Sequence, residues 1–158
     1  MKKYLILAIA AIAALCSCKN DDGWAPLFVN DTFEGWQSIN GDYFPEVGWS
    51  IKDGVVTSNP EGVRGGDIMT VKEYGNFMLK GEFKLSPLSN SGIKYFINPG
   101  KMPKNNIGCE YQIIDDVDFN EQVCPLKTSQ LTGSLYDIKP ADKTQAKFDP
   151  KDWNEILS

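Results

Sequence analysis

Carboxylates and amides gather in one stretch of the chain, IGCEYQIIDDVDFNEQVC, which runs from Ile107 to Cys124. Its first part, CEYQIID, alternates like a strand, so Glu110 and Gln112 point to one face, two residues apart. A carboxylate can act as a general acid or base, and a side-chain amide can hold a hydroxyl group. Asp115 closes the strand, at the start of a loop where functional groups are common. The stretch predicts a ligand-binding or acid–base face, and the alternative is a solvated strand.

The segment DVDFNE, Asp116 to Glu121, allows two further interpretations. It resembles the E-x-D-x-x-E motif of laminarinase-type β-glucanases, whose two carboxyl groups stand about 5 Å apart on one strand. Here the strand has ended and Asn120 favours a turn, so we interpret the segment as a loop and the match as accidental. The spacing of Asp116, Asp118 and Asn120 also suits a hard cation, although Glu121 stands where a helix-flanked calcium loop needs glycine. An irregular, oxygen-ligated divalent metal site stays open as an alternative.

The chain contains no histidine in its 158 residues. Catalysis by Ser-His-Asp or Cys-His arrangements and zinc bound by histidine are therefore excluded. The formal charge is −5 and there is no basic run, so nucleic acid is not an expected partner and neutral ligands such as sugars are. Acid–base chemistry would have to use carboxylates, lysine, tyrosine or water.

The N-terminal residues MKKYLILAIAAIAALCSC predict a secretory signal. Two lysines precede an apolar run of twelve residues, Tyr4–Leu15, which is too short to span a bilayer core of about 30 Å. Leu15, Cys16 and Ser17 precede Cys18 and resemble a bacterial lipobox, in which the chain is cut before the cysteine and that cysteine carries lipid. The alternative is ordinary signal cleavage with an unmodified Cys18.

This N-terminus gives the expected organisation of the chain. Residues 1–17 are a lipoprotein signal peptide outside the fold, 18–26 a linker after lipidated Cys18, and 27–158 one folded domain. The protein is then anchored to a membrane by lipid, in the bacterial cell envelope. We expect an outer-membrane lipoprotein, periplasmic or surface-exposed.

Two cysteines remain after the predicted signal. Cys109 and Cys124 lie fifteen residues apart. Outside the cytoplasm they could form a disulfide worth about 3 kcal/mol. The alternative is that Cys109 is a small buried apolar residue, and the spacing leaves both open.

The body of the chain is predicted to be β-structure throughout, with turn-forming residues about every ten positions. Asp53-Gly54 predicts a hairpin between WSIK and VVTS. Alternating strands are expected in NFMLKGEFKLS, NSGIKYFINP and CEYQIID, and residues 72–75 could make one helical turn. Apolar inward faces of this kind favour a two-sheet sandwich. The opposite face of one sheet would carry a polar and aromatic set: Glu82, Lys94, Phe96, Glu110 and Gln112.

The final residues KDWNEILS predict the beginning of a further strand, which suggests a shortened chain. Seven motifs, in register over residues 27–157, make the chain resemble the 3-keto-disaccharide hydrolase family: LFVNDTFEGW, GWSIKDGVVTSN, GGDIMTVKEYGNFMLKGEFKLSP, NSGIKYF, GCEYQIIDD, LTGSLYDIKP and KDWNEI. The resemblance implies an all-β, concanavalin A-like jelly roll that lacks its last strands. It also implies a secreted or lipid-anchored protein.

The resemblance further implies a hydrolase whose substrate is a glycoside oxidised to a ketone at C3. Removal of the C2 proton, elimination at C1 and hydration would then cleave the glycosidic bond. We assign Glu110 as the base or acid, Lys94 as the cation for the enolate, and Asp115 as a second acid–base or metal candidate. The residues expected to bind substrate are Asn90, Gln112, Tyr136 and Asp67. A non-catalytic carbohydrate-binding lipoprotein of the same fold is the alternative. Whether the site also binds a divalent metal through oxygen ligands stays open.

Overall fold

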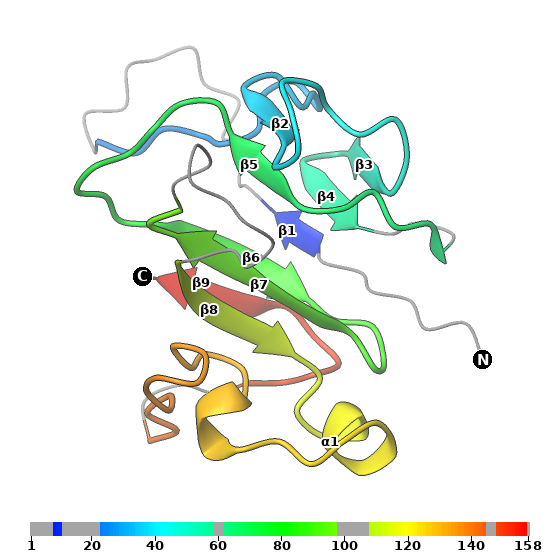
Figure 1. Ribbon diagram of the computed structural model, residues 1–158, viewed down its shortest axis with the longest axis vertical. Helices are drawn as coiled ribbons and strands as arrows, with labels where there is room; N and C mark the ends of the chain where they lie inside the picture. Colours follow the sequence, from blue (N-terminus) through cyan, green and yellow to red (C-terminus); the bar gives the residue numbers. More distant parts are fainter. Residues whose placement is uncertain (1–7, 11–22, 59–61, 98–107, 145–147, 158) are drawn as a thin grey trace. The chain divides into compact units, whose positions relative to one another are not determined.

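The computed structural model describes residues 8–10, 23–58, 62–97, 108–144 and 148–157 (Figure 1). The chain divides into two compact units. One, called here the β7–β8 unit, contains the described residues of Lys84–Asn154. The other, the five-stranded unit, contains those of Ala8–Phe83 and Glu155–Ser158. The regular structure of the described residues is almost entirely strand, which confirms the all-β class predicted from the sequence.

The five-stranded unit is built on one sheet with the strand order β3-β4-β1-β6-β9. Its strands are β1 (Ala8–Ala10), β3 (Trp49–Lys52), β4 (Val55–Ser58), β6 (Lys80–Lys84) and β9 (Asn154–Leu157). A second, two-stranded sheet pairs β2 (Trp36–Ser38) with β5 (Ile68–Thr70). The predicted strand at the end of the chain is therefore present as β9.

The predicted hairpin between β3 and β4 is confirmed. Both turn residues have positive φ, 52° at Asp53 and 76° at Gly54, as a two-residue type I′ turn requires. The carboxylate of Asp31 accepts hydrogen bonds from the backbone N–H groups of Asp53 and Gly54, each at 2.8 Å. A contact distant in sequence thus fixes a turn that local sequence already favours.

Strand β1 comes from the segment predicted to be a signal outside the fold. Its backbone lies between β4 and β6, with Ile9 paired to Val56 and Ala10 to Val55. This placement of β1 satisfies backbone N–H and C=O groups of β4 and β6, which would otherwise be unpaired at this position of the sheet. The signal peptide itself stays a prediction. In the described part of the chain, no helix has the length and hydropathy to cross a membrane.

Aromatic rings pack against one another in the segment 28–44 of the five-stranded unit. Phe28 stacks on Trp36 with ring centroids 4.7 Å apart, and Phe33 stacks on Phe44 at 4.1 Å. The Trp36 indole N–H also donates to the Leu27 carbonyl at 2.8 Å. The most buried apolar side chains of the two units are Phe28, Val56, Phe83, Leu85, Ile113, Ile114 and Ile156.

Three local predictions are corrected. The strand expected from Asn76 to Ser86 is only Lys80–Lys84, and Phe77, an apolar residue of the predicted alternation, is 42% exposed. Residues 72–75 form no helical turn. Phe96 lies beyond the end of its strand, because its positive φ of 60° breaks the extended backbone.

Candidate active site

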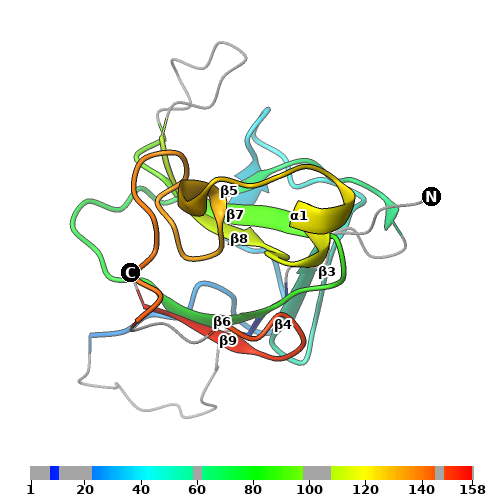
Figure 2. The same ribbon diagram turned by 90° about the horizontal axis from the view of Figure 1, so that it is seen from below.

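The β7–β8 unit brings together most of the predicted site residues. Strand β7 (Asn90–Tyr95) pairs antiparallel with β8 (Cys109–Ile114), and the two lie side by side in both views (Figures 1 and 2). The register places Lys94 opposite Glu110, and Gly92 opposite Gln112. Directly opposite residues of an antiparallel pair share a face, so the predicted common face of Lys94, Glu110 and Gln112 is confirmed.

The segment after the short 3-10 helix Thr128–Gln130 runs along the other edge of β8. The Gln112 N–H donates to the Ser134 carbonyl at 3.0 Å, and the Tyr136 N–H donates to the Glu110 carbonyl at 2.9 Å. Leu135 forms an antiparallel bridge with Tyr111. Tyr136 therefore lies beside Glu110, and Lys94, Glu110 and Tyr136 occupy neighbouring positions in one row across three adjacent segments.

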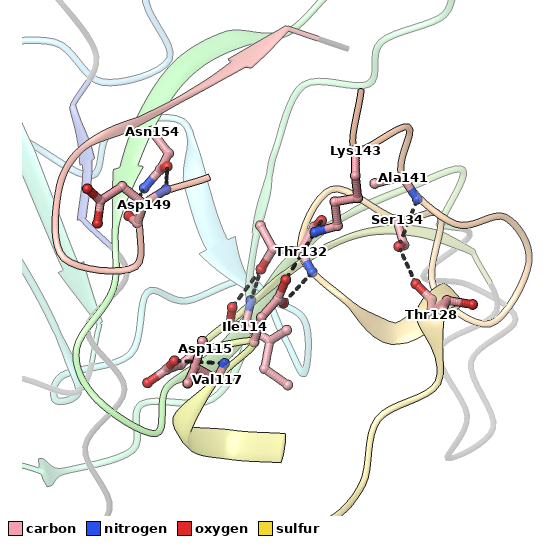
Figure 3. Close-up of polar contacts among 11 residues, drawn as sticks. Ile114, Asp115, Val117, Thr128, Thr132, Ser134, Ala141, Lys143, Asp149 and Asn154 are labelled. Carbon is pink, nitrogen blue, oxygen red and sulfur yellow. Dashed lines mark hydrogen bonds and ion pairs between the residues drawn. The ribbon is translucent and has the colours of Figure 1, made fainter. Parts of the chain in front are cut away.

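Side chains at the end of β8 hold this third segment in place (Figure 3). The Thr132 hydroxyl accepts from the Ile114 N–H at 2.8 Å and donates to the Ile114 carbonyl at 2.6 Å. Asp116 accepts from the Thr132 N–H at 2.7 Å and forms an ion pair with Lys143 at 3.0 Å. The buried Ser134 hydroxyl donates to the Thr128 carbonyl at 3.1 Å. These contacts explain why a turn-rich sequence stays beside the strand.

Gln112 is buried, with 2% of its surface exposed. Its amide N–H donates to the Asn90 side-chain oxygen at 3.4 Å, so two of the predicted substrate-binding residues are linked. Among the residues that the structure describes, the Gln112 Oε1 atom has no hydrogen-bond partner. A buried acceptor without a partner carries a free-energy penalty, and such groups often mark functional positions.

Glu110 leans along the sheet toward Gly92. A β-carbon added at residue 92 would overlap the Glu110 carboxylate and lie 2.8 Å from its Cγ and 2.9 Å from its Cδ. Glu110 is half-buried, whereas Lys94 is exposed and Tyr136 is 37% exposed. The face thus offers a partly shielded carboxylate flanked by an accessible ammonium and an accessible phenol.

Asp115 has a different environment from the one expected. It is 4% exposed, and its Oδ2 accepts from the Leu88 N–H at 2.9 Å. Its Oδ1 accepts from the N–H groups of Val117 at 3.3 Å and Asp118 at 3.2 Å, at the start of helix α1 (Asp118–Gln122). Both oxygens are engaged by backbone amides, as in a structural carboxylate, so the structure lends no support to Asp115 as a catalytic group.

The acidic segment after β8 is also corrected. It was expected to be a loop, but Asp118–Gln122 form the short helix α1, and the Asn120 side chain accepts from the Leu126 N–H at 2.7 Å. Glu121 lies on this helix and not on a strand with Asp116, so the glucanase geometry is absent. Within the described ranges, no group of three or more Cys, Asp or Glu side chains is arranged to hold a metal.

Asp67, the remaining predicted substrate-binding residue, belongs to the other unit. It is exposed and lies in the five-stranded unit, where its backbone carbonyl accepts from the Ile39 N–H at 3.1 Å. Its predicted role in substrate binding stays untested.

Cys109 and Cys124 are both free thiols, so the disulfide allowed by their spacing is not formed. Cys109 begins β8, whereas Cys124 follows the helix beyond the opposite end of that strand. Five strand steps alone span about 17 Å, far more than the roughly 7 Å that a disulfide allows between α-carbons.

Two tyrosines on the opposite face of the β7–β8 sheet have raised pKa values. Burial raises the pKa of Tyr111 above its usual 10.0. The pKa of Tyr95 is raised by burial and, to a smaller extent, by the charge of Cys109, its partner across the sheet. The neutral phenol is favoured at both positions, so these residues suit a packed face more than a proton-transfer site.

Comparisons with known proteins agree with this architecture. Residues 23–157 match the family model described as the 3-keto-alpha-glucoside-1,2-lyase-like domain. The chain is 30% identical, over 142 residues, to a 3-keto-disaccharide hydrolase of Bacteroides thetaiotaomicron, with 80% of this chain and 49% of that protein covered. It is also similar to the crystal structure of a provisionally assigned glycosyl hydrolase from Parabacteroides distasonis, with a TM-score of 0.67 and 31% identity.

The structural match covers 84% of this chain and 61% of the solved one. The chain thus spans about half the length of the curated relative and less than two thirds of the solved structure. The expected jelly-roll class agrees with this likeness.

Proposed function

The chain belongs to the 3-keto-alpha-glucoside-1,2-lyase-like domain family, and from this premise we propose that it cleaves the glycosidic bond of 3-keto-glycosides. Two findings support the proposal. The Bacteroides relative is a 3-keto-disaccharide hydrolase by name. The β7–β8 face carries a carboxylate with a cationic and a phenolic neighbour and needs no histidine.

The row Lys94–Glu110–Tyr136 is the observation that carries the proposal. A ketone at C3 acidifies the proton on C2, so a carboxylate base can remove it. Glu110 takes this proton, and the bond between C1 and the glycosidic oxygen breaks with a C1–C2 double bond forming. The protonated Glu110 then supplies a proton to the departing oxygen. Addition of one water molecule across the double bond, with hydroxyl at C1 and hydrogen at C2, completes net hydrolysis.

The neighbours of Glu110 stabilise the negative charge that develops in this step and bind the sugar. Removal of the C2 proton places negative charge on the C3 oxygen, and the Lys94 ammonium, opposite Glu110, stabilises it. The Tyr136 hydroxyl, which accepts from the Gln130 amide at 3.3 Å, binds a sugar hydroxyl. Asn90, which is exposed on the same sheet face, orients the ring, and the buried Gln112 amide holds the Asn90 side chain by its hydrogen bond.

Replacing Glu110 with glutamine tests the role of the carboxylate. Glutamine keeps the size but cannot take a proton, so we expect kcat/KM on 3-keto-trehalose to fall by about 10² to 10⁴. Release of glucose is the readout. The matched control is Glu121→Gln on the exposed surface of α1, which should stay within about twofold of the unsubstituted chain.

Full activity in Glu110→Gln would remove Glu110 from the mechanism. The second candidate function, a non-catalytic carbohydrate-binding protein, is favoured by the linked amides of Asn90 and Gln112 on the same face. Binding of unoxidised trehalose without turnover of its 3-keto form would support that candidate.

A further inference from the structure

At Gly92, the space that a side chain would fill is occupied by the side chain of Glu110. Glycine inside a strand costs stability, so it usually marks a bulge or a close approach of another group. In β7 the approaching group is the Glu110 side chain, whose Cγ, Cδ and carboxylate fill the position where a β-carbon would stand. The Gly92 backbone does not adopt a positive φ, so conformational freedom alone does not explain the glycine.

The direction in which Glu110 leans is specific. Its partner across the strands is Lys94, yet its carboxylate lies over Gly92, a member of the next pair on the same face of the sheet. Gln112 shows the same displacement: it stands opposite Gly92, but its amide reaches Asn90. The two side chains therefore lean together, and only a glycine at position 92 leaves the first of them room.

We propose that Gly92 is a positioning residue, which acts through Glu110 by holding its carboxylate over β7 in the orientation required for proton transfer. The expected effect on the reaction rate rests on the proposed function, whereas the placement of the Glu110 carboxylate over Gly92 does not. Any side chain at residue 92 would force the flexible end of Glu110 to swing away. Misplacing a catalytic group by about 1 Å can cost about 10² in rate.

Gly92→Ala is the test, because alanine removes the space while it suits an extended backbone. We expect its melting temperature to equal or exceed that of the unsubstituted chain, since glycine in a strand is unfavourable. We expect kcat on 3-keto-trehalose to fall by about 10² with KM changed by less than about threefold. Gly75→Ala is the matched control, because a β-carbon there meets nothing within 4 Å and the backbone φ is not positive.

A double substitution separates positioning from a merely structural role. Glu110→Ala removes Cγ, Cδ and the carboxylate, so no part of residue 110 beyond its β-carbon is left to fill the space above residue 92. In that background, Gly92→Ala should change kcat by less than about threefold, because the two substitutions act on one contact. Equal effects of Gly92→Ala in both backgrounds would overturn the proposal.

A nuclear Overhauser measurement tests the placement without any activity. The γ-protons of Glu110 should give cross-peaks to the α-protons of Gly92 in the unsubstituted chain, and Gly92→Ala should abolish them. Absence of these cross-peaks in the unsubstituted chain overturns the inference. If the unsubstituted chain has no turnover, the proposed function fails, and the cross-peaks still decide whether Gly92 positions Glu110.

Discussion

Neighbouring side chains on β8 meet very different surroundings. Glu110 is half-buried over Gly92, and Gln112 is almost completely buried. Tyr111, between them, points to the opposite face, where burial raises its pKa. Strand parity alone predicted which face each residue would join. It could not predict burial, because burial depends on tertiary packing, and the pairing of Thr132–Tyr136 with the edge of β8 likewise has no sequence periodicity.

The raised pKa of Tyr111 predicts a loss of stability in alkali. The folded state holds the phenol proton above pH 10.0, where the unfolded chain has begun to release it. Stability is therefore complete below about pH 10 and falls as pH rises toward the folded pKa. Melting temperatures between about pH 9 and about pH 11 should fall less steeply in Tyr111→Phe than in the unsubstituted chain.

Tyr43→Phe is the control for this titration, since Tyr43 is 58% exposed. Its alkaline profile should match that of the unsubstituted chain. Identical slopes in all three proteins would mean that burial of Tyr111 does not couple its titration to folding.

Among the elements, the turn set by local residue types was predictable from the sequence, whereas the strand ends set by tertiary contacts were not. The Asp53-Gly54 turn was predictable because positive φ at both residues is a property of those residue types. The alternation in NFMLKGEFKLS continues beyond β6, since the end of a strand is set by its partners and not by its own pattern. Helix α1 was missed because five residues are too few for a helical period, and with it the structural role of Asp115 was missed.

Asp115 joins the turn before β7, the end of β8 and the start of α1, so we expect its loss to destabilise the fold. Asp115→Ala would leave the backbone N–H groups of Leu88, Val117 and Asp118 without this acceptor. The expected decrease in the free energy of unfolding is about 2 to 4 kcal/mol, measured by urea denaturation.

Asp118→Ala, in the first turn of the same helix, is the matched control. It removes a favourable charge at a helix N-terminus and should cost at most about 1 kcal/mol. If Asp115→Ala destabilised no more than this control, the three hydrogen bonds would not carry the junction.

For the whole molecule, the family match and the candidate site fall on the same part of the chain. The match covers residues 23–157, which includes every described residue of the candidate site. The resemblance visible in the sequence was therefore sufficient for the family and the fold class. The arrangement of Lys94, Glu110 and Tyr136 needed the structure, because it joins three segments through register and one loop.

Attachment to the cell envelope is a prediction at this same scale. If Cys18 is lipidated, Cys18→Ser should move the protein from the membrane fraction to the soluble fraction of bacterial cells, since the lipid is the anchor. Immunoblots of the two fractions measure this. Cys16→Ser should leave the distribution unchanged, and equal fractionation of the unsubstituted chain and Cys18→Ser would argue against a lipid anchor at that residue.

We propose that the β7–β8 face cleaves glycosides only after oxidation at C3. Glucose release from 3-keto-trehalose and from trehalose, measured with the unsubstituted chain and with Glu110→Gln, tests this requirement. We predict release from the 3-keto sugar alone, lost in Glu110→Gln. Equal release from both sugars would show that oxidation at C3 is not required, and turnover of 3-keto-trehalose that survives in Glu110→Gln would show that the Glu110 carboxylate is not the base.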